Sequence, residues 1–418
     1  VSSAALSAAR LTLPGVMDTE GRVDESRLRM HIFKNGVCPP ERGLAWRFLF
    51  GMYPCSSTPL ERSLLCEQLL VRYFAMKRKW QRFLPSAVRM QLNGTDELVS
   101  AVRFFDQREA QAQQQIQDQS EEVRDRLAFL ELQAQILFER VTFDQQELQE
   151  AIRIIDKDVP RTNRDLSYYD EGLGNLLVLR NVLITYAAFH PVSYAQGMND
   201  LCSRFLEVLD SEVDAFWSFS CYMEKFSRDF RADGLHRKIL EAALLKELDP
   251  LLYAHLVKDS MESFTFCHWL LLGFQREFEH SDALRLFEIL SCDHLELISQ
   301  KVDRAHYRER LAQKYSAEDG LKTQLPAFNT DFTFELFICA AILLDNRESL
   351  LQCQDDVQLI QFTSLQGTLD LNGTLKKAEN HFYNYCKRCA WDYMKERCGA
   401  RSKHEDFFYQ LRSLFVLK

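Results

Sequence analysis

Apolar residues recur at helical spacing through most of the chain, and this pattern alone assigns many segments to helices. Leu148, Ile152, Ile155 and Val159 follow at intervals of four, three and four residues, which places them on one face of a helix. The same reasoning predicts further helices at about 174–189, 198–209, 211–226, 235–258, 262–278, 281–290 and 332–344. The tail to Lys418 also has a helical pattern. The fold class predicted is therefore all-α.

Prolines mark the beginning of helices near the N-terminus. Residues 25–50 predict one helix, a Gly-Val turn and a second helix that is entered through Pro39 and Pro40. A proline is tolerated there because the first helical turn leaves its N–H groups unpaired in any case. Another helix follows in "PLERSLLCEQLLVRYF", with a Ser or Thr as its cap, and runs to about Phe83.

Residues 85–150 differ from the rest because they are rich in glutamine and charge. An apolar stripe nevertheless runs through them at heptad-like spacing, formed by Val123, Leu127, Leu130, Ala134, Leu137 and Val141. About three heptads lie at the threshold for a coiled coil. Two interpretations remain open. In the first, the stretch is a long helix that packs on its own domain or is partly disordered. In the second, residues 120–141 present a surface for a helical partner or for dimerisation.

Composition narrows the class of protein further. Only 15 glycines and 10 prolines occur in 418 residues, which favours helices, and the net charge of −9 argues against nucleic-acid binding. The sequence has no run of 18 apolar residues, so it predicts no membrane-spanning helix. The chain begins with Val1 rather than methionine, so we interpret it as a fragment or processed chain.

Cysteines raise the question of a metal site. The chain has 12 of them, mostly within apolar helical patterns typical of reduced core residues. Cys386 and Cys389 have zinc-like spacing, and Cys398 and His404 follow. The surrounding sequence has the pattern of one continuous helix, whereas zinc pairs usually lie on turns. We therefore expect no metal.

A first candidate for chemistry lies in "IIDKDVPRTNR", residues 154–164. Pro160 disfavours helical geometry for Val159 and should end or redirect the helix, which leaves Arg161 on a turn. Asp158 is close enough to accept hydrogen bonds from its guanidinium. An anchored, projecting arginine suits the stabilisation of negative charge on a phosphoryl group. The alternative is a helix cap or a surface ion pair.

A second candidate lies in "SYAQGMND", residues 193–200. Pro191 breaks the preceding helix, so Tyr194 and Gln196 fall on a loop or on the first turn of the next helix. Gly197 has no side chain beside Gln196, so another molecule can approach the backbone closely. A glutamine both donates and accepts, and can orient a water against a phosphoryl group. The alternative is that Gln196 bonds backbone carbonyls within the turn.

Together the two motifs resemble the fingerprints of the TBC family of Rab GTPase-activating proteins. Ile155, Asp158 and Arg161 fit I-x-x-D-x-x-R, and Tyr194, Gln196 and Gly197 fit Y-x-Q-G. The segment "GVCPPERGLAWRFLFG" is similar to the opening helix of the family, with Arg42 and Trp46 at its characteristic positions. Later helices, at 266–278, 284–290 and 335–344, extend the resemblance over roughly 30–345.

The resemblance implies an all-helical domain that binds a GTP-loaded Rab and accelerates its GTP hydrolysis. Arg161 would be the arginine finger and Gln196 a second, glutamine finger. Asp158 would orient Arg161. The site would be supported by Tyr194, Gly197 and Ile155. The partner would be contacted by Arg42 and Trp46. GTP and Mg²⁺ would come with the Rab, and the protein would have no cofactor of its own. A catalytically weak scaffold or a helical adaptor is the alternative.

The resemblance also suggests a division of the chain. Residues 1–29 would form a lead-in, 30–345 the TBC-type domain, and 346–418 a helical extension. Two stretches, about 85–150 and 293–330, are long for the family and are interpreted as insertions. We expect a cytoplasmic location, with recruitment to organelle membranes as an open alternative and no transmembrane segment.

Overall fold

The fold is built from helices. The computed structural model describes residues 13–87, 120–170, 173–191, 193–230, 235–257, 267–293, 332–353, 358–359, 362 and 369–395. Within these ranges the elements are helical, apart from an isolated β-bridge between Met17 and Val23. The all-α prediction is confirmed. The chain divides into two compact units, Val1–Leu28 with Val37–Arg231, and Arg29–Gly36 with Ala232–Lys418.

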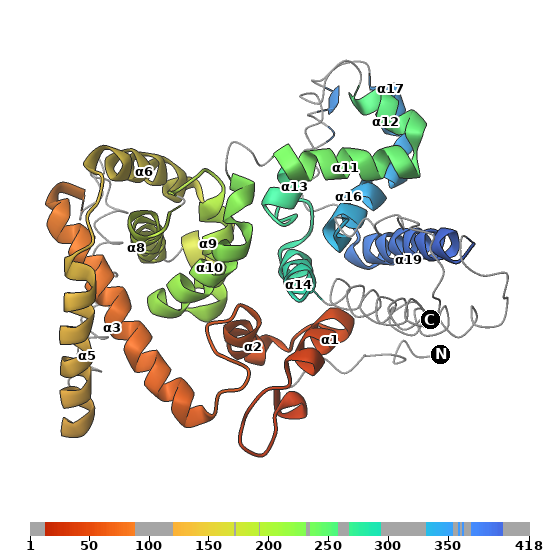
Figure 1. Cartoon of the computed structure of the whole chain (residues 1–418). Helices are drawn as coiled ribbons and strands as arrows, with labels where there is room; N and C mark the ends of the chain where they lie inside the picture. Colours follow the sequence, from red (N-terminus) through yellow and green to blue (C-terminus); the bar gives the residue numbers. More distant parts are fainter. Residues whose placement is uncertain are drawn as a thin grey trace, which may run out of the picture. The chain divides into compact units, whose positions relative to one another are not determined.

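The first unit contains the two candidate motifs (Figure 1). Its α-helices are α2 (Arg42–Leu49), α3 (Pro59–Phe83), α5 (Glu121–Glu139), α6 (Gln145–Asp158), α7 (Ser167–Asp170), α8 (Leu173–Phe189), α9 (Met198–Leu209) and α10 (Glu212–Phe226). Short 3-10 helices η1 (Leu13–Val16), η2 (Pro39–Glu41), η3 (Pro85–Ala87), η4 (Val159–Arg161) and η5 (Ser227–Phe230) connect or flank them. The boundaries predicted for α2, α3 and α8 to α10 agree with these to within a few residues.

Helix α9 lies at the centre of this unit, and most of its residues are buried. Phe205 of α9 packs edge-on against Trp46 and Phe50, with ring centroids 5.4 and 4.7 Å away. Phe219 of α10 closes the cluster at 6.0 Å from Phe205. Because each buried aromatic side chain removes a large apolar area from water, this cluster fixes α2, α9 and α10 together.

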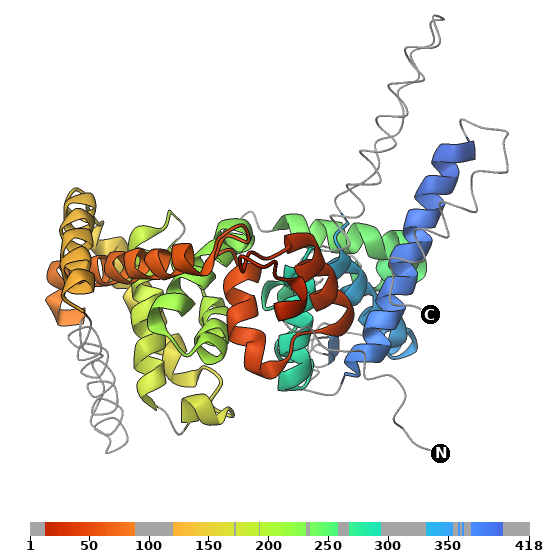
Figure 2. The same cartoon turned by 90° about the horizontal axis from the view of Figure 1, so that it is seen from below.

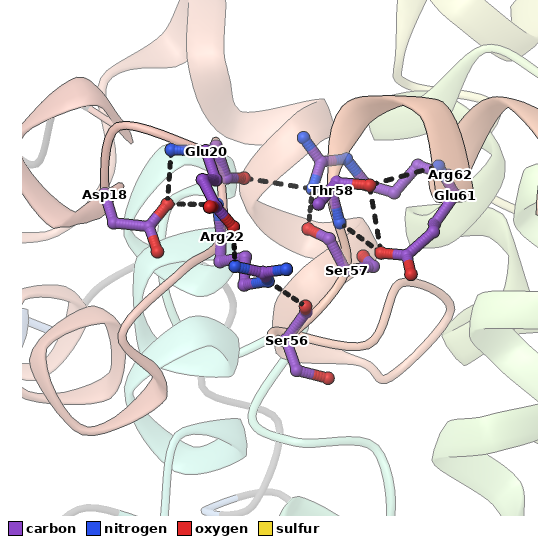
Figure 3. A network of polar contacts seen from close by, with 9 residues as sticks. Asp18, Glu20, Arg22, Ser56, Ser57, Thr58, Glu61 and Arg62 are labelled. Carbon is purple, nitrogen blue, oxygen red and sulfur yellow. Dashed lines mark hydrogen bonds and ion pairs between the residues drawn. The ribbon is translucent and has the colours of Figure 1, made fainter.

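A polar network holds the N-terminal turn against the start of α3 (Figure 3). Thr58 caps α3, which confirms the predicted Ser or Thr cap, and it also forms a capping box with Glu61. Arg22 donates to the backbone oxygen of Ser56 at 3.0 Å, and Arg62 donates to that of Gly21 at 3.1 Å. The residues around Arg22 are therefore tied to the first unit rather than trailing from it.

Helix α5 packs against the C-terminal half of α3 (Figures 1 and 2). Ala134 of α5 is buried against Val71 and Ala75 of α3, and Leu127, Leu130 and Phe138 pack around this cluster. Arg126 adds two hydrogen bonds to the Glu67 carboxylate at 2.6 and 2.8 Å. The interpretation as a helix packed on its own domain is confirmed for 121–139, while residues 88–119 lie outside the described ranges.

The second unit contains α11 (Leu235–Leu248), α12 (Pro250–Val257), α13 (Cys267–Leu271), α14 (His280–Ser291), α16 (Phe334–Asp345), α17 (Arg347–Gln352) and α19 (Leu371–Lys395). Most of α1 (Glu25–Asn35) belongs to it as well. Helix α16 is buried along nearly its whole length, as its apolar run predicted. Phe337 of α16 packs against Phe382 of α19 at 5.1 Å.

Two predicted helices differ from the observed ones. The helix predicted over 235–258 is two helices, because Asp249 separates α11 from α12 and its carboxylate accepts from the N–H of Leu252. The helix predicted over 262–278 has only α13 in its described part. Gly273 and Phe274 follow with φ of 58° and 56°, and this left-handed backbone ends the helix. The insertion predicted at 293–330 lies outside the described residues except for Asp293.

The proposed division at 29 and 345 stays a prediction. The two compact units are divided near residue 231, within the predicted TBC-type stretch.

Candidate functional site

The first motif lies at the end of α6. Its apolar face is buried as the spacing predicts, with Leu148, Ile152 and Ile155 exposing 4%, 6% and 0% of their surface. Each such burial stabilises by about 1.5–3 kcal/mol. The buried guanidinium of Arg180 in α8 adds two hydrogen bonds to the half-buried Asp156 carboxylate, at 2.6 and 3.2 Å. The stem that presents Arg161 is therefore firmly attached, and Ile155 contributes to this packing.

Pro160 redirects the chain differently from the prediction. Val159 keeps a right-handed helical conformation, with φ −55° and ψ −46°, and its N–H donates to the carbonyl of Ile155. The chain tightens into the 3-10 turn η4 and becomes extended only at Thr162. The prediction that the helix ends or is redirected at Pro160 is confirmed, because α6 ends at Asp158, but the prediction that helical geometry is disfavoured for Val159 is wrong. A proline is tolerated at the start of such a turn because its missing N–H is not required there.

Arg161 projects into solvent from this turn while its guanidinium contacts a buried carboxylate. Its side chain is 63% exposed, and that of Asp158 is 3% exposed. Arg161 Nη2 donates to Asp158 Oδ1 at 2.5 Å. The contact predicted between the two residues is present, and it is a single hydrogen bond rather than a two-bond fork.

Tyr194 connects the two motifs. Its hydroxyl donates to Asp158 Oδ2 at 2.7 Å, so the two carboxylate oxygens receive hydrogen bonds from different motifs. Burial, followed by the Asp158 carboxylate, raises the pKa of Tyr194 far above its ordinary value. The phenol therefore stays protonated and remains a donor. Tyr194 and Arg161 are thus brought onto the same carboxylate, a contact of Tyr194 that the sequence did not predict.

Gln196 is exposed on the turn that leads into α9. Gly197 is the N-terminal cap of α9 and has φ 98°, which is a left-handed conformation that glycine adopts without strain. The prediction placed Gln196 on a loop or first helical turn, and the structure places it immediately before the helix. A glycine is needed at position 197 because the backbone there is left-handed.

Sequence reasoning missed two residues of this site, Thr162 and Asn199. Both are buried, with 1% and 5% of their surface exposed. Asn199 Nδ2 donates to Thr162 Oγ1 at 2.9 Å, and Asn199 Oδ1 accepts from the N–H of Gly197 at 3.2 Å. No local sequence signal marks either residue, because the contact that joins them connects positions 37 residues apart.

Trp46 does not lie at an accessible surface. It is fully buried and packs on Phe50 and Phe205, with ring centroids at 5.0 and 5.4 Å. Its assignment as a partner-contact residue is corrected to a core residue, because no part of its side chain is accessible. Arg42 begins α2 and is partly exposed, so its role in partner binding stays a prediction.

The sequence also predicted that the chain has no metal site and no membrane-spanning helix. Cys386 and Cys389 fall within α19, in keeping with the continuous helix predicted there, while Cys398 and His404 lie outside the described residues. Among the residues described, no group of three His, Cys, Asp or Glu side chains is arranged to hold a metal ion. Within the same ranges, none of the helices combines the length and apolarity that crossing a membrane requires.

Comparison with known proteins identifies the family. The profile of RabGAP-TBC, the Rab-GTPase-TBC domain, matches residues 109–302, which include both motifs. The chain is 28% identical over 386 residues to the GTPase-activating protein GYP7 of Yarrowia lipolytica, covering 88% of this chain and 42% of that protein. It is 30% identical over 281 residues to human TBC1 domain family member 17, covering 65% and 35%. The chain therefore spans less than half the length of these relatives.

A solved structure supports the same fold. The Ypt/Rab-GAP domain of Gyp1p aligns over 90% of this chain and 96% of its own length, with a TM-score of 0.53 and 16% identity. At this identity the likeness shows the fold alone. The profile match, the relatives and the two adjoining motifs agree with it. The chain belongs to the TBC-domain family of Rab GTPase-activating proteins.

Proposed function

We propose that this chain accelerates GTP hydrolysis by a Rab GTPase, to which it supplies Arg161 and Gln196. The observation that supports this most directly is the arrangement around Asp158. One of its carboxylate oxygens accepts from Arg161 and the other from Tyr194, two residues before Gln196. This shared carboxylate supports the proposal that the two motifs act together.

Arg161 has the properties of an arginine finger. Its stem is rigid, its side chain is mostly exposed, and its charge is permanent. The transferred phosphoryl group spreads negative charge over its oxygens in the transition state, and an arginine supplied by an activator is worth about 10³–10⁵ in rate. The contact with Asp158 orients the guanidinium before the Rab arrives, which lowers the cost of ordering it.

Gln196 is proposed to orient the attacking water in place of the glutamine of the Rab. It is exposed, and its amide can accept from water while donating to a phosphoryl oxygen. The GTP and Mg²⁺ would be carried by the Rab. Through its Rab the protein would act at the cytoplasmic face of organelle membranes and regulate vesicle traffic.

Single-turnover phosphate release from a panel of GTP-loaded Rabs tests this proposal. We expect strong acceleration for at least one Rab, and a loss of about 10³-fold or more with Arg161→Lys, because lysine keeps the charge but not the planar donor geometry. Arg153→Lys is the matched control, since Arg153 is an exposed arginine on α6 that pairs with Glu150.

Two other results would contradict the proposal. Near-normal rates with Arg161→Lys would exclude the finger assignment. Tight Rab binding without any acceleration by the unaltered chain would instead indicate a scaffold.

A further inference from the structure

Asn199 lies between the two turns that present Arg161 and Gln196. Its amide oxygen accepts from the N–H of Gly197, directly after Gln196, at 3.2 Å. Its amide nitrogen donates to the hydroxyl of Thr162, directly after Arg161, at 2.9 Å. One side chain is thus bonded to the chain next to both proposed fingers.

The contact between Asn199 and Thr162 is linked in turn to Asp158 at the end of α6. Thr162 Oγ1 donates to the backbone carbonyl of Asp158 at 2.9 Å, so its proton is directed away from Asn199. The Thr162 oxygen can then only accept from Asn199, which fixes the amide nitrogen on that side. The Tyr194 hydroxyl lies 3.1 Å from the amide oxygen, on the other side. The orientation of the amide follows from these partners.

We propose that Asn199 is a positioning residue that holds the arginine and glutamine fingers in register. The inference rests on the proposed function. Asn199 itself is 5% exposed and does not reach the surface where a Rab would bind. It acts through Gly197 and Thr162, whose separation determines where the two fingers meet the nucleotide. A misplacement of about 1 Å is enough to cost about 10²-fold in rate.

Isosteric substitutions separate this role from packing. Asn199→Asp keeps the shape but presents an oxygen, rather than a donor, to Thr162 Oγ1 and to Asp200, whose carboxylate lies 3.3 Å from the amide nitrogen. Thr162→Val keeps the shape and removes the hydroxyl. Asn175→Ala is the matched control, because Asn175 is also buried and donates at 2.9 Å to the carbonyl of Tyr168, away from both fingers.

The measurement is single-turnover hydrolysis by a responsive Rab over a range of activator concentrations. We expect Asn199→Asp and Thr162→Val each to lower the maximal rate about 10- to 100-fold, with half-saturation within about threefold of the unaltered chain. The double variant should lose much less than the product of the two single losses, because both break one connection. Asn175→Ala should keep the maximal rate.

The outcomes are distinguishable. If the unaltered chain accelerates no Rab, the proposed function fails, and the inference fails with it. If the unaltered chain is active and Asn199→Asp retains the maximal rate, only the positioning role is overturned. If the Asn199 and Thr162 variants lose rate only in proportion to the fraction that thermal melting shows to be unfolded, Asn199 is a structural residue.

A separate observation concerns the outer face of α5. Phe129, Leu132 and Ile136 are 60%, 55% and 61% exposed. At about 100° per residue they fall within an arc of about 60°, roughly opposite Ala134, which packs on α3. The helix is therefore apolar on two faces. Leu127, Leu130 and Ala134 of the heptad-like stripe lie on the inner face, whereas Leu137 of the same stripe is 57% exposed.

Charge flanks this outer face at both ends. Asp125 lies one turn before Phe129, Arg140 lies one turn after Ile136, and both are exposed. If two copies of α5 cross antiparallel about the midpoint between residues 132 and 133, Phe129 meets Ile136 of the second copy. The same symmetry brings Asp125 opposite Arg140 of the second copy. In this antiparallel arrangement, apolar residues of one copy face apolar residues of the other, and acidic residues face basic ones.

We infer that the outer face of α5 pairs with the same face of a second copy of this chain. A two-fold arrangement makes each contact twice, so a small self-complementary face gains from symmetry. The charged pairs add little energy because they are exposed, but they select the antiparallel register over the parallel one, where like charges would meet.

Sedimentation velocity over a concentration series tests this. We expect the unaltered chain to dimerise, Leu132→Glu to weaken the association at least tenfold, and Leu60→Glu, at a 71% exposed leucine of α3, to leave it unchanged. Asp125→Arg should weaken it, and Asp125→Arg combined with Arg140→Asp should restore it. A monomer at every concentration, or a double variant weaker than the single one, would overturn the inference and assign the face to another partner.

Discussion

Asp158 accepts a hydrogen bond from Arg161 at 2.5 Å although the aspartate side chain is 3% exposed and the arginine side chain 63% exposed. A surface ion pair usually contributes little, because both groups are solvated and mobile. Here one partner is fixed inside the protein by Tyr194, so only the arginine has freedom to lose. The pair is suited to aiming a guanidinium rather than to stabilising the fold.

Asp158→Ala should therefore reduce the maximal rate of Rab GTP hydrolysis while Rab binding persists. The substitution removes the group that orients Arg161 and leaves Arg161 itself in place. It also leaves the buried Tyr194 hydroxyl without its shorter hydrogen bond, which costs about 1–3 kcal/mol of unfolding free energy. Rates and affinities for a responsive Rab, together with a chemical denaturation curve, check this. A joint collapse of binding and stability would assign Asp158 a purely structural role.

Tyr194→Phe tests the other side of the same carboxylate. The variant keeps the ring and removes the hydroxyl that donates to Asp158 Oδ2. We expect a loss of about 1–3 kcal/mol in stability and a smaller loss of rate than with Arg161→Lys, because the guanidinium keeps its own bond to Oδ1. Tyr168→Phe is a control, since that hydroxyl donates to Asp210 outside the site. A rate as low as that of Arg161→Lys would show that Tyr194 contributes directly.

Apolar spacing was sufficient to predict the helices that position the site. Leu148, Ile152, Ile155 and Val159 lie on the buried face as their intervals require, because a helix packed on one side must repeat apolar residues every three or four positions. The same spacing could not predict the break at Asp249, where apolar residues continue on both sides. That break depends on a side-chain cap and on Pro250.

The site itself was predicted as two separate motifs rather than as a connected structure. Arg161 and Gln196 stand out in the sequence because of Pro160 and Gly197 beside them. Asn199 and Thr162 do not stand out, since their importance lies in contacts between residues 37 positions apart. Such contacts arise because α6 and α9 both pack on α8, and no local pattern encodes them.

Trp46 provides a prediction on the fold. Its side chain is fully buried in the aromatic cluster with Phe205, so Trp46→Ala should lower the unfolding free energy by about 3–5 kcal/mol. Arg42→Ala, four residues earlier and partly exposed, should change stability little. Thermal and denaturant unfolding measure both. If Trp46→Ala unfolds like the unaltered chain but loses Rab affinity, its correction to a core residue is wrong.

The last prediction separates a two-finger mechanism from one that uses Arg161 alone. In most GTPases a glutamine of the GTPase orients the attacking water, and its replacement by leucine blocks hydrolysis. If Gln196 orients that water in trans, a responsive Rab whose glutamine is changed to leucine should still hydrolyse GTP when this chain is added. Gln196→Ala should abolish that hydrolysis and also slow the normal Rab, while leaving the fold intact because the side chain is exposed. Single-turnover phosphate release for the four combinations of normal and altered partners measures this. A different result would be strong acceleration of hydrolysis by the normal Rab but none by the Rab with the glutamine-to-leucine change. That result would assign Gln196 a structural role in the turn before α9.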